Sequence, residues 1–175
     1  MKKSLLGTLL LAASLSAGTL GFESGVIKAH TEVFGDSSID PMFKKAHSKL
    51  SMDAEPSTLR GVIEVSIGDF ISDNKKRDAN MYEAMESDKF PKASFEIKEV
   101  VAKGGDNYLL KGTMNLHGVA KAMNFEGTVA EEGGKVRIKA KSAMKMSDFG
   151  IQPPKMVFLV VRDQVDLNVD VVLKR

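Results

Sequence analysis

Apolar and polar side chains alternate with a period of two along most of the chain after residue 22. Such alternation indicates strands with one face buried and the other in water, because successive side chains of a strand point to opposite faces. The clearest example runs from Val165 to Leu173 near the C-terminus. The pattern predicts eight strands, over residues 27–33, 45–52, 62–67, 94–98, 110–116, 123–129, 136–146 and 165–174.

Between the third and fourth expected strands the spacing becomes helical. Apolar residues recur there at intervals of three and four, at Met81, Ala84 and Met85. Asp78 or Asn80 is a suitable cap for the helix start, and Phe90–Pro91 disfavours continuation. We therefore expect one short helix that packs an apolar stripe on the sheet.

A second segment, residues 156–161, is apolar throughout and follows Pro153 and Pro154. Without a period, it is compatible with a buried loop, a strand extension or one helical turn.

Short strands joined mainly by tight turns predict an all-β protein. The expected fold is a single eight-stranded antiparallel sheet closed into a lipocalin-like barrel, with the short helix between strands three and four. A two-sheet sandwich is the alternative. Strands of about nine residues, tilted by ~40°, give a barrel roughly 20 to 25 Å tall, which a long hydrocarbon chain can thread.

The N-terminus has the anatomy of a secretory signal peptide. Lys2 and Lys3 precede an apolar run from Leu5 to Leu15, and small residues follow at positions 16–18. The run is shorter than the roughly 20 residues of a membrane-spanning helix. We predict that residues 1–18 are removed on export to the bacterial periplasm and that residues 19–175 form one domain. A buried N-terminal helix is the alternative.

Loss of this leader balances the charge of the chain. Removing Lys2 and Lys3 reduces 25 basic residues to 23, which equals the 23 acidic ones. Nucleic acid or an anionic membrane therefore loses its electrostatic support as a partner. The absence of cysteine excludes disulfides, thiolate chemistry and a lipid-modified cysteine anchor. We expect a soluble domain without stable membrane insertion, and a homodimer is left open.

Few residues indicate catalysis. Two of the three histidines, His30 and His47, lie in the polar phase of their strands, and the third is His117. Surface positions explain them more simply than a metal site does. The sequence contains no nucleophile elbow, phosphate-binding loop or dinucleotide fingerprint. We therefore expect neither an enzyme nor a cofactor or metal site.

The inward-facing residues are compatible with a plain core or with a lipid tunnel. Nine of the ten methionines follow the leader, and most of those on the strands lie in the apolar phase. Flexible thioethers suit a plain core and a tunnel for a mobile chain equally well, and Gly112 and Gly127 would leave space inside. The residues expected to contact a lipid are Leu50, Met52, Phe70, Met81, Met85, Phe95, Leu110, Gly112, Met114, Met123, Phe125, Ile138, Met144, Phe149 and Phe158.

Lys75, Lys76 and Arg77 form the densest basic run, just before the expected helix. They are candidates for a phosphate or pyrophosphate headgroup at the barrel mouth. A solvated helix flank is the alternative, because Asp73 and Asp78 border the run.

Three blocks of sequence carry a family resemblance. Residues 72–81 and 87–95 combine a polar segment with Phe90–Pro91 and a following strand, residues 112–121 form a strand, glycine-centred turn and strand, and residues 147–151 precede the last strand. Together they resemble the YceI-like periplasmic proteins. The resemblance implies an extended lipocalin-like barrel that binds polyisoprenoids or related long-chain lipids.

Two functional classes follow. The first is periplasmic binding or carriage of a long-chain apolar lipid, of polyisoprenoid or fatty-acyl type. The alternative is a secreted stress-response or interaction module whose barrel is filled by its own side chains. An internal cavity distinguishes the two classes.

Overall fold

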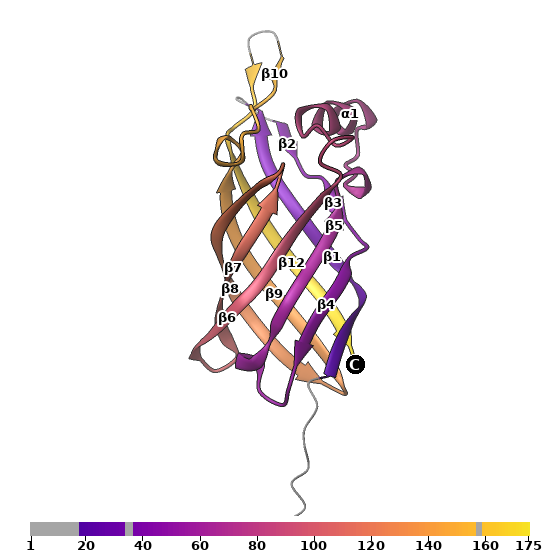
Figure 1. Cartoon of the computed structure of the whole chain (residues 1–175). Helices are drawn as coiled ribbons and strands as arrows, with labels where there is room; N and C mark the ends of the chain where they lie inside the picture. Colours follow the sequence, from indigo (N-terminus) through magenta and orange to yellow (C-terminus); the bar gives the residue numbers. More distant parts are fainter. Residues whose placement is uncertain (1–17, 34–36, 157–158) are drawn as a thin grey trace, which may run out of the picture.

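The computed structural model describes residues 18–33, 37–156 and 159–175. Figure 1 shows a tall barrel with the C-terminus at one end and the helix at the other. The predicted leader up to residue 17, and Phe158 among the expected lipid contacts, lie outside the described residues. Gly18, the last residue of the predicted leader, is the first residue of a strand.

The predicted closed barrel of eight antiparallel strands is confirmed. Each barrel strand pairs with the next in the order β12-β9-β8-β7-β6-β5-β4-β1, and β1 also pairs with β12 to close the sheet. The barrel strands are β1 (Gly18–Val33), β4 (His47–Met52), β5 (Arg60–Ser66), β6 (Lys92–Gly104), β7 (Asn107–Leu116), β8 (Val119–Glu132), β9 (Lys135–Lys145) and β12 (Gln164–Lys174).

Shorter elements occupy the connections. The helix α1 (Lys75–Ala84) follows β5, the third barrel strand along the chain, as expected. The remaining elements are the short strands β2 (Ser37–Ile39), β3 (Met42–Phe43), β10 (Lys155–Met156) and β11 (Leu159–Val160), and the 3₁₀ turns η1 (Pro56–Thr58), η2 (Ile67–Asp69) and η3 (Ser147–Phe149).

The helix begins earlier than predicted. Its N-cap is Asn74, whose side-chain oxygen accepts hydrogen bonds from the backbone N–H groups of Lys76 (3.0 Å) and Arg77 (3.2 Å). The prediction of Asp78 or Asn80 as the cap is therefore wrong. Asp78 is instead buried and accepts hydrogen bonds from the backbone and hydroxyl of Ser72, which ties the preceding loop to the helix.

The described residues of the apolar segment, 156 and 159–161, form a separate pair of short strands and a bridge to β1, which is none of the three expected structures. Lys155 and Met156 pair with Val160 and Leu159 in a separate β10–β11 hairpin, at the same end of the barrel as α1 (Figure 1). The chain then returns to the barrel wall, where Val161 pairs with Val33.

We call the end of the barrel that carries the C-terminus and the β4–β5 connection the closed end (Figure 1). Apolar side chains fill its interior, and the following are fully shielded from solvent: Leu20, Met52, Leu59, Val136 and Leu173. The opposite end, with α1 and the β10–β11 hairpin, is called the mouth.

Two of the strand pairings end before they reach the mouth. β8 and β9 pair between the closed end and the residue pair Glu126 and Lys141, and not beyond it. Just past this last pair, the hydroxyl of Ser142 donates to the Asn124 carbonyl (2.6 Å). β1 and β4 pair only over Gly18–Leu20, where the Ser48 hydroxyl donates to the Leu20 carbonyl (2.7 Å). Towards the mouth β1 pairs instead with β3 and then with β2. Strand pairing is therefore continuous at the closed end, while towards the mouth β8 and β9 are unpaired with each other and short strands replace β4 beside β1.

Candidate functional site

An apolar cavity of about 240 Å³ lies inside the barrel. All eight barrel strands contribute inward-facing side chains, and almost all of the exposed lining is apolar. On β12 the lining runs from Val171 to Val165, roughly 20 Å along the strand at ~3.3 Å per residue. The volume is slightly below the ~300–1,000 Å³ of ordinary small-molecule pockets. A long, narrow space of this kind suits a chain better than a compact ring.

Three segments surround the cavity at the mouth. Helix α1 contributes Met81 and Ala84, the segment around β2 contributes Ile39 and Pro41, and the connection after β9 contributes Pro154. Backbone hydrogen bonds fix these segments to the barrel, including Val161 N–H to the Pro154 carbonyl (3.1 Å) and Ala29 N–H to the Pro41 carbonyl (3.1 Å). The rim is thus built from connections, while the cavity below is built from strands.

Ten of the residues expected to contact a lipid lie in the cavity wall. They are Leu50, Phe70, Met81, Met85, Phe95, Leu110, Met114, Phe125, Ile138 and Met144. Phe95 and Phe125 meet edge-on, with ring centroids 4.8 Å apart.

Other expected contacts lie elsewhere. Met52 is part of the packed closed end, and Met123 packs against the main core without reaching the cavity. Phe149 belongs to η3, in the connection that follows β9, and is buried in a separate cluster with Leu116 and Ile151. All three side chains are at least half buried, as expected, but the cavity occupies only part of the interior.

The glycines do not provide the expected space. A Cβ atom on Gly112 would lie 2.1 Å from the Glu96 carbonyl oxygen and 2.7 Å from the Phe95 ring. On Gly127 it would lie 1.9 Å from the Lys139 carbonyl oxygen. These glycines allow neighbouring strands to approach closely, so the room beside them is already filled.

The sequence analysis missed several lining residues on the first and last strands. β1 supplies Ile27 and Ala29, and β12 supplies Leu167 and Val169. The signal was available, because all four lie in the apolar phase of predicted strands.

The three basic residues expected at a headgroup do not all lie at the cavity. Arg77 lines the cavity and is half-buried, whereas Lys75 and Lys76 are exposed and absent from its wall. The reason is that all three belong to the first turn of α1, where successive side chains point in different directions.

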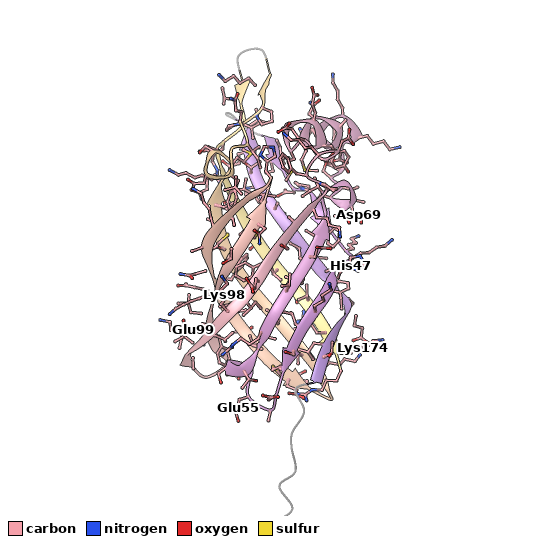
Figure 2. The ribbon with its side chains drawn as sticks, in the orientation of Figure 1. His47, Glu55, Asp69, Lys98, Glu99 and Lys174 are labelled. Atoms are coloured by element: carbon pink, nitrogen blue, oxygen red, sulfur yellow. The ribbon has the colours of Figure 1, made fainter. Side chains whose placement is uncertain are left out.

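The histidines lie away from the cavity wall. Figure 2 shows His47 on the outside of the barrel, where it is exposed. His117 adopts a left-handed backbone (φ 52°) in the β7–β8 turn, and its ring nitrogens contact the Phe149 carbonyl (3.1 Å) and the Glu86 carboxylate (2.8 Å). His117 therefore joins the segment after α1 to η3.

Within residues 18–33, 37–156 and 159–175, no three His, Cys, Asp or Glu side chains gather at a spacing that would hold a metal ion. In the same ranges, no helix is long and apolar enough to span a bilayer.

A closed eight-stranded antiparallel barrel, packed at one end and hollow towards the other, defines a lipocalin-like binding barrel. The YceI-like domain model matches residues 19–173, so the chain belongs to the YceI-like family. A YceI-like barrel with an apolar interior is consistent with the binding of a hydrophobic ligand.

Related sequences align with most of the chain. A UPF0312 protein of Pseudomonas putida strain F1 is 26% identical over 172 residues, covering 88% of this chain and 90% of the relative. A UPF0312 protein of Pseudomonas fluorescens strain SBW25 is 27% identical over the same length and coverage.

Two solved structures share the fold. Burkholderia cenocepacia BcnA has a TM-score of 0.75 at 20% identity and covers 85% of this chain and 95% of its own. The Campylobacter jejuni YceI protein has a TM-score of 0.57 at 15% identity and covers 100% and 99%.

Proposed function

We propose that this protein binds a long-chain apolar lipid, of polyisoprenoid or fatty-acyl type, inside its barrel and carries it in the periplasm. The observation that supports the proposal is the long apolar cavity between the packed closed end and the mouth. A barrel filled by its own side chains, as the alternative interaction module requires, would not leave this space.

The energetics of burial are sufficient for such a ligand. Each methylene group removed from water contributes about 0.8 kcal/mol, so burial of about ten contributes roughly 8 kcal/mol. Immobilisation of the chain opposes this by several kcal/mol, while further contacts of the ligand at the mouth add to it. Since a Kd of 1 μM corresponds to about −8 kcal/mol, micromolar binding requires a longer chain: about fifteen buried methylenes contribute roughly 12 kcal/mol and offset the cost of immobilisation.

The polar content of the cavity favours binding over catalysis. Its wall contains four polar side chains, Thr31, Arg77, Asn80 and Ser94, within the described residues. The Thr31 hydroxyl already donates to the backbone carbonyls of Arg162 and Gln164. No acid–base or nucleophile–base pair is formed by these four groups.

Native mass spectrometry of protein purified gently from the periplasm tests the proposal. We expect an added mass that disappears on denaturation and that identifies a long-chain lipid. Protein that is folded and empty, and that remains empty after incubation with prenyl and fatty-acyl lipids, would contradict lipid carriage.

A variant that narrows the cavity tests whether the lipid binds inside the barrel. Ile63 lines the cavity from β5, whereas its neighbour Val62 does not, because it lies in the opposite phase of the strand. Ile63→Trp is expected to weaken lipid binding at least about tenfold, equivalent to roughly 1.4 kcal/mol. The matched control Val62→Trp should leave it nearly unchanged. Equal binding by both folded variants would place the ligand outside the barrel.

A further inference from the structure

Arg77 is the single charged side chain in the cavity wall among the described residues. It is half-buried on the first turn of α1, and its Nη1 atom donates to the Ser38 carbonyl oxygen (3.1 Å). This hydrogen bond links the helix to β2 and holds the guanidinium at the mouth. An arginine in this position lies where an apolar interior meets water.

No carboxylate neutralises this guanidinium within the part of the chain that the structure describes: the salt bridges found there, at N–O distances up to 4.0 Å, do not include Arg77. The adjacent Asp78 is buried and accepts hydrogen bonds from Ser72 instead. An arginine has five N–H donors, and among the described residues Ser38 is the one hydrogen-bond acceptor that the Arg77 side chain contacts.

Asn80 adds a second polar group on the same side of the helix. It follows Arg77 by three residues, which places both side chains on one helix face, and both line the cavity. Among the side-chain hydrogen bonds of the described residues, none involves the side-chain amide of Asn80. The mouth therefore presents a guanidinium and an amide above an apolar cavity.

We propose that the bound lipid is a long-chain amphiphile with an anionic head, a carboxylate or a phosphate, which Arg77 and Asn80 bind at the mouth while the chain fills the cavity. This inference rests on the proposed function and narrows its ligand class. The planar guanidinium matches the paired oxygens of a carboxylate or phosphate, and bonds to charged acceptors are the stronger kind. Lys75 and Lys76 take no part, because they point away from the cavity wall.

The test compares ligands that share one alkyl chain and differ in the head: a fatty acid, an alkyl phosphate and a fatty alcohol, titrated at pH 8. The wild-type protein should bind both anionic ligands at least about tenfold more tightly than the alcohol. Arg77→Gln should remove this preference and leave alcohol binding unchanged, since the apolar contacts persist. Arg77→Lys, which keeps the charge without the planar fork, should keep part of the preference.

A matched control separates local recognition from the general field of the helix. Lys75→Gln with Lys76→Gln removes two charges from the same helical turn and should leave the preference intact. The assignment would be overturned if the preference for anionic ligands survives Arg77→Gln. It would also be overturned if the double variant Lys75→Gln with Lys76→Gln abolishes the preference equally. Circular dichroism melting curves confirm that each variant is folded.

Two further outcomes are informative. Equal affinity of the wild-type protein for acid and alcohol would overturn the head assignment while supporting the apolar cavity as the site. No binding of any of the three ligands would instead contradict the proposed function itself. Inorganic phosphate alone should not displace the alkyl phosphate at equal concentration, and displacement would indicate a site for the free anion.

Discussion

Phe125 shows how a single side chain defines the inside of the barrel. It is 5% exposed and packs edge-on against Phe95, while its neighbours Asn124 and Glu126 are exposed. Because strand geometry alternates the two faces, one buried aromatic determines the phase of the whole of β8. The same phase places Gly127 inside, where the backbone of the neighbouring strand takes up the room that a side chain would need.

This phase predicts unequal effects of two adjacent substitutions. Phe125→Ala should lower the free energy of unfolding by about 3 kcal/mol, the lower end of the range of about 3 to 5 kcal/mol for loss of a buried aromatic ring. Glu126→Gln should change it by less than about 0.5 kcal/mol, because surface substitutions seldom matter. Urea unfolding of both variants measures the difference. Similar small effects from both would show that the strand faces the other way.

At the scale of elements, the segment from β2 to β3 is joined to the barrel by side chains as well as by backbone. On β1, His30 Nδ1 lies 2.6 Å from Asp40 Oδ1, and Lys28 Nζ lies 3.0 Å from the same oxygen. Asp40 precedes Pro41, which lines the cavity. These contacts therefore hold part of the rim against the outer face of β1.

The hydrogen bond with Asp40 raises the pKa of His30 above its ordinary 6.5, against the effect of burial. Glu32, 3.3 Å from Nε2, acts in the same direction. Burial alone would raise the pKa of Asp40, but its hydrogen bonds with His30 and Lys28 prevail and lower it below 3.8. Protonated His30 thus stabilises the fold below about pH 6.5, and this contribution disappears as pH rises through its folded pKa. Ionised Asp40 contributes above about pH 4 and loses this contribution on acidification.

The His30–Asp40 contact consequently stabilises the fold most between about pH 4 and pH 6.5. His30→Gln should lower the unfolding free energy more at pH 5.5 than at pH 8.5, by under about 1 kcal/mol, because both side chains are partly exposed and screened. Chemical unfolding at the two pH values measures this difference. His47→Gln, on the outer face of β4, is the matched control. An equal effect of His30→Gln at both pH values would exclude a contribution from its proton.

At the scale of the whole molecule, the two ends of the barrel differ. The first strand begins beside the closed end, where Gly18 pairs with Met52 and Leu20 pairs with Leu50. Leu20 is fully shielded from solvent, so the barrel needs the chain from at least this residue onwards. Removal of the predicted leader before Leu20 would leave the closed end complete, whereas removal beyond it would not.

Export predicts a defined N-terminus. Intact-mass measurement of periplasmic protein should show loss of a segment that ends within about residues 16 to 19, next to the small residues that follow the apolar run. Recovery of only the full-length chain from the membrane fraction would contradict cleavage. An N-terminus beyond Leu20 would contradict its role in the closed end.

The sequence by itself determined the number of barrel strands, which side chains turn inward, and the place of the helix between β5 and β6. These properties are local, because the period of a strand or helix follows from backbone geometry and the covalent neighbours of each residue. Phe95, Phe125 and Ile138 could therefore be assigned to the interior without knowledge of the strand order.

Only the tertiary structure decided where the interior is filled and where it is hollow. Met52 and Leu50 share a face of β4, yet Met52 packs into the closed end while Leu50 lines the cavity. Likewise, Arg77 reaches the cavity while the adjacent Lys76 does not. The physical reason is that these differences depend on strand register, on the start of α1 and on the backbone facing each position, all of which arise from contacts between residues far apart in the chain.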